Sequence, residues 1–175
     1  MTRDAQRAKV RDAQRAKVYA AEEFVRTMFD RAAERGDPVV EFFGTSLTLP
    51  PEARFASAEA VQRYVDDVLD HPAVRERWPA LPPLRVRPRR GHTAAHYECA
   101  GGAATIAVPE RGAVWALREL VVLHEIAHHL VHHSAEACAA HGREFVATFG
   151  ELAAVVMGPE VAHVLRVVYA KEGVR

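Results

Sequence analysis

The run VVLHEIAHHLVHH, residues 121–133, holds the side chains of this sequence best suited to chemistry. Within it His124, Glu125 and His128 form an HExxH motif. On a helix, residues four apart lie on one face, so both imidazoles can reach a single metal ion. Glu125 lies about 100° around the helix, where its carboxylate can approach a water bound to that ion. The motif therefore predicts metal-assisted hydrolysis, with zinc on the two histidines and Glu125 as general base.

A catalytic zinc ordinarily has three protein ligands, and the motif supplies two. His132 continues the same helical row but lies about 12 Å along the axis from the first histidine. The metzincin spacing puts a third histidine at position 134, which is Ser134 in this chain. We expect His141 to be the third ligand, because the seven residues 134–140 let the chain turn back from the helix end. Glu144 and Glu151 are alternative third ligands, because in some zinc sites of this kind a glutamate on a following helix completes the coordination.

Other polar residues near the motif have less specific roles. Cys138 lies three residues before the proposed third ligand and could approach the metal, although a small buried thiol is the ordinary role for such a residue. His129 and His133 point about 140° and 180° away from His124, which predicts that both face outward. Carboxylates that could hydrogen-bond the ligand imidazoles are Glu110, Glu119 and Glu136, and groups able to stabilise an oxyanion are His96, Arg143, His163 and Tyr169.

Hydrophobic periodicity predicts the elements that position the motif. One helix should end near Arg35, before Gly36-Asp37-Pro38, and another should run from Ser57 to about Asp70. The proline-rich stretch 71–88 is expected to be mainly irregular. The remaining expected elements are strands within 39–49, 84–87, 93–98 and 104–108, followed by helices at about 114–133, 142–157 and 159–170. This order predicts an α+β fold with helices packed on a small sheet.

Composition limits the class of protein. The 175 residues carry 23 Lys+Arg against 23 Asp+Glu, and 49% are hydrophobic, which fits a single domain over residues 1–175. The balanced charge does not favour a nucleic-acid binder, and no apolar run is long enough to predict a membrane-spanning helix. The charged start MTRDAQRAKV does not favour a signal peptide, and Cys99 and Cys138 cannot build a disulfide scaffold. We therefore expect a cytoplasmic protein without a membrane partner.

The chain begins with an eight-residue tandem repeat, RDAQRAKV at Arg3–Val10 and again at Arg11–Val18. One copy is too short to be a structural repeat unit. Both copies are rich in helix formers, so residues 1–18 are expected to form a peripheral helical extension. Because eight residues turn about 80° on a helix, the two copies cannot present the same face to one core. The first copy is therefore expected to be dispensable.

Several segments of the chain resemble a known family. HEIAHHL at 124–130, HGREF at 141–145, GPEVAHVLRVVY at 158–169 and RAKVYAAEEF at 15–24 resemble the actinobacterial HExxH-motif metallohydrolases, and more distantly the SprT-like zinc metalloproteases. The resemblance covers most of the chain. It implies a zincin-like fold, with a small, mainly antiparallel sheet above the active-site helix, and it supports His124, His128 and His141 as zinc ligands with Glu125 as base. Two cysteines cannot form the zinc ribbon that many SprT proteins append, so a DNA-linked role is not carried over.

Two further segments are candidate binding surfaces. Ala104–Val108 leads towards the motif helix, and in zincins an edge strand pairs with an extended peptide substrate. This segment is therefore a candidate substrate strand, with an ordinary edge or core strand as the alternative. The basic cluster RVRPRR, residues 85–90, contains Arg85, Arg87, Arg89 and Arg90. It lacks the interleaved aromatic residues of many nucleic-acid sites and is expected to be solvated.

The expected function is that of a zinc-dependent metallohydrolase, a metallopeptidase acting on a peptide or protein substrate. The alternative is a non-catalytic zinc-binding domain that regulates or binds a partner. A closed site of three histidines and Cys138 would suit that alternative, because it leaves no position for water. Glu125 argues against it, since a structural zinc needs no base. A third hypothesis, nucleic-acid binding through the arginine cluster, predicts salt-dependent affinity.

Overall fold

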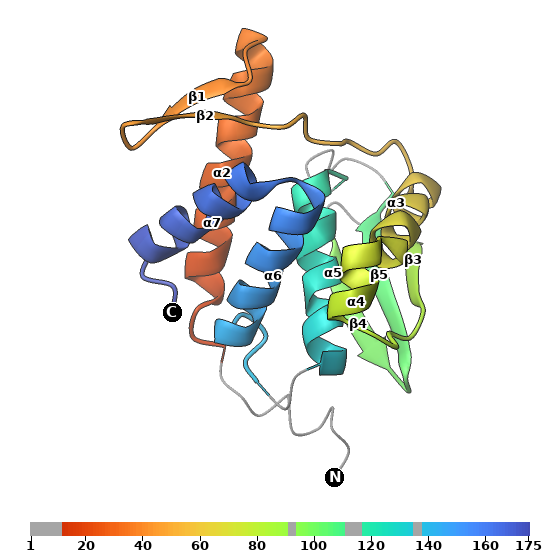
Figure 1. Ribbon diagram of the computed structural model, residues 1–175. Helices are drawn as coiled ribbons and strands as arrows, with labels where there is room; N and C mark the ends of the chain where they lie inside the picture. Colours follow the sequence, from red (N-terminus) through yellow and green to blue (C-terminus); the bar gives the residue numbers. More distant parts are fainter. Residues whose placement is uncertain (1–11, 91–93, 111–116, 135–137) are drawn as a thin grey trace. The chain divides into compact units, whose positions relative to one another are not determined.

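The computed structural model describes residues 12–90, 94–110, 117–134 and 138–175. These residues form an α+β fold of six helices and five strands, as predicted (Figure 1). The chain divides into two compact units, one of residues 1–51 and 135–175 and the other of residues 52–134. Among the described helices, none combines the length and the apolar character needed to cross a membrane.

The described part of the unit of residues 1–51 and 135–175 contains three helices and a hairpin. Its elements are α2 (Arg15–Arg35), β1 (Val39–Phe42), β2 (Thr45–Thr48), α6 (Arg143–Val156) and α7 (Pro159–Lys171). Helix α7 packs against both α2 and α6 (Figure 1). Helix α2 ends as predicted, because Gly36 takes a left-handed conformation with φ of 64° that closes the last turn. Both strands, α6 and α7 lie where the sequence predicts them, whereas α2 begins later than predicted, at Arg15.

A buried hydrogen bond joins α2 to α7 within this unit. The Tyr169 hydroxyl donates to Glu22 Oε1 at 2.8 Å, and the two residues are 3% and 2% exposed. Burial, followed by the charge of Glu22, raises the pKa of Tyr169 well above its ordinary value, so the hydroxyl stays protonated. Tyr169 therefore stabilises helix packing here and does not have the exposure expected of an oxyanion-binding group.

The unit of residues 52–134 contains the motif helix and a three-stranded sheet. Its elements are α3 (Ala58–Asp70), α4 (Pro72–Arg77), β3 (Leu84–Arg89), β4 (His96–Ala100), β5 (Ala103–Pro109) and α5 (Glu119–Ser134). The strand order is β3-β5-β4, with β5 parallel to β3 and antiparallel to β4. Helix α3 packs on β3 and α5 packs on β4 (Figure 1).

The proline-rich stretch 71–88 contains more regular structure than the sequence predicts. Helix α4 begins at Pro72, because proline is tolerated in the first helical turn and the His71 ring caps the Ala73 N–H at 3.3 Å. Pro88 lies inside β3, opposite Val108. An outer strand accommodates proline because the missing N–H can face away from the neighbouring strand. The expectation of a mainly irregular segment was wrong for these two parts.

The candidate substrate strand occupies a different place from the one expected. Ala104–Val108 belongs to β5, which is the middle strand and is paired on both sides. A strand whose hydrogen-bonding groups are already paired with two neighbours cannot add a peptide at its edge. Ala104–Val108 is therefore an ordinary core strand, the alternative expectation, and the substrate-strand prediction is wrong; β4 is the outer strand that lies against α5.

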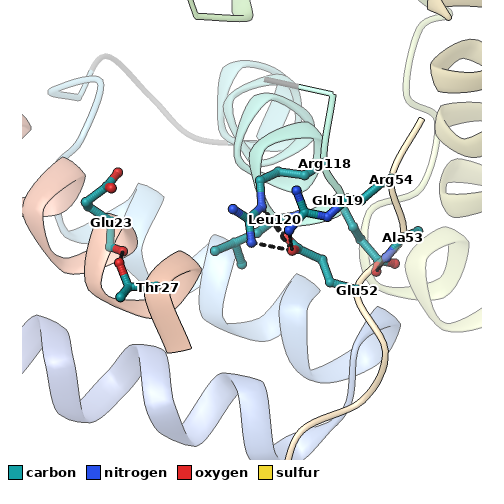
Figure 2. A network of polar contacts seen from close by, with 8 residues as sticks. All are labelled: Glu23, Thr27, Glu52, Ala53, Arg54, Arg118, Glu119 and Leu120. Carbon is teal, nitrogen blue, oxygen red and sulfur yellow. Dashed lines mark hydrogen bonds and ion pairs between the residues drawn. The ribbon is translucent and has the colours of Figure 1, made fainter. Parts of the chain in front are cut away.

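The beginning of α5 is held by a buried ion pair. Arg118 and Glu52 have side chains that are 2% and 3% exposed, and their closest N–O distance is 2.5 Å. Arg118 Nε also lies 2.9 Å from both carboxylate oxygens, and Glu52 Oε1 accepts the Leu120 N–H at 3.4 Å (Figure 2). An anionic carboxylate at a helix N-terminus is stabilised by the N–H groups exposed there. The Glu52 carboxylate therefore both neutralises Arg118 and caps the N-terminus of α5.

A second set of hydrogen bonds fixes the same helix end. Ala53 and Glu119 form two hydrogen bonds: the Glu119 N–H donates to the Ala53 carbonyl oxygen at 2.9 Å, and the Ala53 N–H donates to the side-chain oxygen Oε2 of Glu119 at 2.9 Å. The Tyr64 hydroxyl of α3 donates to Glu119 Oε1 at 2.6 Å. Burial, and then the Glu119 charge, raises the pKa of Tyr64, so it remains a donor. Both Glu119 oxygens therefore bind groups that anchor the helix start.

Replacing Arg118 with methionine should lower the free energy of unfolding by about 3–5 kcal/mol, because the Glu52 carboxylate would remain buried without its counter-charge. Thermal and denaturant unfolding followed by circular dichroism measures the change. Arg54→Met is the matched control: Arg54 also faces Glu52, but at 3.8 Å and with a side chain 44% exposed. The control should cost less than about 1 kcal/mol. Equal losses in the two variants would contradict a special role for Arg118.

Candidate metal centre

Helix α5 is buried along most of its length, and His124 and Glu125 of the HExxH motif share that burial. Its apolar residues Leu120, Leu123, Ile126 and Leu130 have no exposed surface, while His124 is 2% and Glu125 4% exposed. Imidazole and carboxylate groups are costly to bury unless each has a partner. The buried His124 and Glu125 side chains are therefore expected to have partners.

The two motif histidines converge on one point. His124 and His128 bring their Nε2 atoms to 3.1 Å from each other, with ring centroids 4.8 Å apart and planes at 75°. Two imidazoles on one tetrahedral zinc, with Zn–N bonds of 2.0–2.1 Å, would have nitrogens ~3.3 Å apart. The observed separation fits that requirement closely. These two side chains could hold a zinc ion with little rearrangement.

Glu125 is oriented by the neighbouring strand. Its Oε2 accepts the Tyr97 N–H of β4 at 2.6 Å. The Tyr97 ring lies almost parallel to the His128 ring, with centroids 6.4 Å apart and an interplanar angle of 19°. One residue of β4 therefore positions both the carboxylate and a histidine of the motif. The sequence predicted a strand at Tyr97. It carried no signal for the hydrogen bond between Tyr97 and Glu125, because that bond depends on how the strand packs against the helix.

The geometry of the motif stands without support from known relatives. No protein-family model, curated protein or solved structure matches this chain. The assignment of the centre therefore depends on the two imidazoles, on the carboxylate and on the groups that hold them.

His141, the expected third ligand, belongs to the unit of residues 1–51 and 135–175. It is 4% exposed, and its Nδ1 lies 2.6 Å from the Asp12 carboxylate. Since a carboxylate only accepts, Nδ1 must carry the proton, which leaves the lone pair of the neutral ring on Nε2. A carboxylate that fixes the tautomer in this way is typical of zinc-binding histidines. Tyr19 and Phe145 flank the ring, with centroids 5.2 and 5.0 Å away.

The second repeat copy holds His141 in place. Besides the Asp12 contact, Gln14 Nε2 donates to the His141 carbonyl oxygen at 3.2 Å and to the Arg175 carbonyl oxygen at 2.8 Å. Helix α2 begins only at Arg15, so Asp12 and Gln14 precede it. Helix propensity had favoured a helix through both copies, but these contacts compete with it. The first copy, Arg3–Val10, lies outside the described residues.

His129 is not on an outer face, contrary to the expectation from helical rotation. It is fully buried, with Nε2 donating to the Pro82 carbonyl oxygen at 3.0 Å and Nδ1 lying 3.4 Å from the Tyr97 hydroxyl. Burial, and then the proximity of His133, lowers the pKa of His129 to about 4. The ring is therefore neutral at pH 7. His129 is buried despite its rotation away from His124 because the Pro82 carbonyl packs against that face of α5.

The other residues considered from the sequence have different contacts or positions. Glu119 is committed to the helix start, and Glu136 lies outside the described residues. Glu144 and Glu151, the rival third ligands, are exposed on α6. Of the remaining oxyanion candidates, His96 faces Arg89, His163 faces Arg166, and Arg143 is exposed.

Proposed function

We propose that the chain is a zinc-dependent metallohydrolase with a zincin-like fold, and that it cleaves peptide bonds. His124, His128 and His141 are the proposed zinc ligands and Glu125 the general base. The observation that carries the proposal is the 3.1 Å separation of the two motif Nε2 atoms beside a carboxylate oriented by Tyr97.

The proposed chemistry divides between the ion and the side chains. A bound zinc supplies Lewis acidity that lowers the pKa of a coordinated water towards about 7. Glu125 accepts a proton from the attacking water and then delivers it to the leaving amine, as general base and general acid in turn. The Tyr97 N–H keeps the carboxylate directed while it is buried. Because Glu125 is 4% exposed, it works with little competition from bulk water.

The outer strand β4 is the proposed site of substrate pairing. In an antiparallel pair, alternate residues turn their N–H and C=O groups to the partner strand and the others turn them away. The Tyr97 N–H reaches Glu125, so Tyr97 belongs to the set that faces away from β5. Cys99, two residues later, belongs to the same set. An extended peptide along this edge would bring its scissile carbonyl near Glu125 by β-augmentation.

The hydrogen bond between Asp12 and His141 provides a test of the third ligand. Asp12→Asn should weaken zinc affinity by about 10–100-fold, because an amide cannot hold His141 in its metal-binding tautomer as strongly as a carboxylate does. Competition with a chromophoric chelator measures the affinity. Asp70→Asn, at a side chain 78% exposed, is the matched control and should leave the affinity unchanged. An unchanged affinity in Asp12→Asn would argue against His141 as a ligand.

The function as a whole is tested by metal analysis followed by an activity screen. We expect zinc to co-purify with the intact chain, as measured by mass spectrometry of the metal content. The same preparation should cleave members of an unbiased peptide library, and chelation should stop the cleavage. A chain that binds zinc tightly but cleaves no peptide would contradict the peptidase and favour the zinc-binding regulatory domain.

A further inference from the structure

A second group of metal-binding side chains lies at the opposite end of α5 from Glu119. It consists of Cys99 on β4 with His132 and His133 in the last turn of the helix. The thiol and the imidazole nitrogens that these residues offer all lie within 4.8 Å of one another. All three residues are half-buried and belong to the unit of residues 52–134. We call this group the Cys99 cluster.

We propose that the Cys99 cluster binds a zinc ion of its own, separate from the HExxH centre. A thiolate with two imidazoles is a donor set that favours zinc and copper over magnesium and calcium, which prefer oxygen ligands. A tetrahedral zinc would hold its nitrogen and sulfur ligands ~3.3–3.6 Å apart. Because the ligand atoms of the Cys99 cluster lie within 4.8 Å of one another, side-chain shifts of about 1 Å would bring them to that spacing. Side-chain rotation at the end of a helix and on an outer strand can supply such shifts.

The cluster is distinct from the HExxH pair because of where α5 places its histidines. His132 lies two turns beyond His124, about 12 Å along the helix axis, which is too far for one ion. The Tyr97 ring is adjacent to a histidine of each group, with its centroid 6.4 Å from that of His128 and 5.9 Å from that of His132. Since residues two apart on a strand share a face, Tyr97 and Cys99 both face α5. Tyr97 therefore lies beside both histidine-containing groups of one helix.

Binding at the Cys99 cluster would connect β4 to the end of α5. The same strand carries the Tyr97 N–H that orients Glu125. An ion on Cys99, two residues further along, would restrict the movement of β4 relative to the helix. Three protein ligands leave one position for water, so the ion would be exchangeable. The cluster is a stabilising metal site, and its existence does not depend on the proposed peptidase activity.

Cobalt(II) substitution in the full chain tests the thiolate ligand directly. A cobalt–thiolate bond gives a near-ultraviolet charge-transfer band that histidine ligands alone do not give. We expect the band in the parent chain, its loss in Cys99→Ser, and its retention in Cys138→Ser, the matched control at the second cysteine. Retention of the band in a His124→Ala, His128→Ala double variant would separate the cluster from the HExxH centre. A band that disappears in Cys138→Ser and persists in Cys99→Ser would overturn the proposal.

Zinc content and thiol protection give a second measurement. Cys99→Ser and His132→Ala should each contain one zinc per chain less than the parent, whereas His163→Ala, the control on α7, should lose none. In the unmutated chain, added zinc should slow alkylation of Cys99 by about tenfold or more, because a metal-bound thiolate is a poor nucleophile. Peptide mass spectrometry identifies the modified cysteine. Equal alkylation of Cys99 with and without zinc would exclude the thiolate ligand even if a variant failed to fold.

Discussion

Replacing Glu125 with glutamine is expected to reduce peptide hydrolysis by about 10²–10⁴-fold while leaving the zinc content unchanged. Glutamine has the same shape as glutamate, and its amide oxygen can still accept the Tyr97 N–H. It cannot accept a proton from water at neutral pH, so only the base is lost. Because Glu125 is not a zinc ligand in the proposed centre, the ion should remain. Metal analysis and cleavage rates measured on one preparation separate the two effects.

Glu59→Gln is a matched control for this variant, because Glu59 is exposed at the first turn of α3. It carries the same chemical change away from the motif and should keep the parent rate. Full activity in Glu125→Gln would show that another group removes the proton, and the catalytic proposal would be wrong. Loss of zinc in Glu125→Gln would instead indicate that the carboxylate is itself a ligand.

The local features of the fold were predictable because each depends on nearby residues. The end of α2 and the boundaries of α3, α6 and α7 follow from helical periodicity together with stop and cap residues such as Gly36 and Ser57. The convergence of His124 and His128 follows from helix geometry alone, since their spacing of four puts both rings on one face. These features need no knowledge of tertiary structure.

The features that were missed or misjudged depend on contacts between distant parts of the chain. The order β3-β5-β4 puts the last strand of the sheet in the middle, which alternation of hydrophobic residues cannot reveal. His129 is buried because the backbone at Pro82, far away in sequence, covers it. Pro72 and Pro88 are accommodated because of their positions, at a helix start and on an outer strand. Residue type alone does not specify such positions.

The tandem repeat illustrates how tertiary contacts change the meaning of a sequence pattern. Helix propensity treats the two copies alike. In the structure, the second copy uses Asp12 and Gln14 to contact His141, outside any helix. The Asp12 and Gln14 side chains therefore hydrogen-bond to the buried imidazole and to the carbonyl oxygen of His141. In a helix, the backbone of these residues would instead have formed hydrogen bonds within the helix. Identical octapeptides need not have identical roles, because the residues that each copy can contact depend on its position along the chain.

Replacing His128 with alanine is expected to remove one zinc per chain and the stability that this zinc confers. A ligand at 100 times its dissociation constant stabilises the folded state by about 2.7 kcal/mol. For a chain of this length that corresponds to a rise in melting temperature of about 5–10 °C. The Cys99→Ser substitution, used as the background, removes the second proposed site. Zinc should raise the melting temperature of the Cys99→Ser protein, in which the HExxH residues are unchanged. It should not raise that of the His128→Ala variant.

His128 is the better of the two motif histidines for this experiment, because it is half-buried whereas His124 is 2% exposed. Alanine at position 128 therefore leaves a smaller cavity, and the metal-free protein should keep nearly the melting temperature of the chelated parent. His163→Ala on the same background provides the control and should retain the full zinc-dependent shift. If His128→Ala responds to zinc as strongly as the control does, His124 and His128 do not hold the ion together. Their 3.1 Å approach would then reflect imidazole–imidazole hydrogen bonding alone.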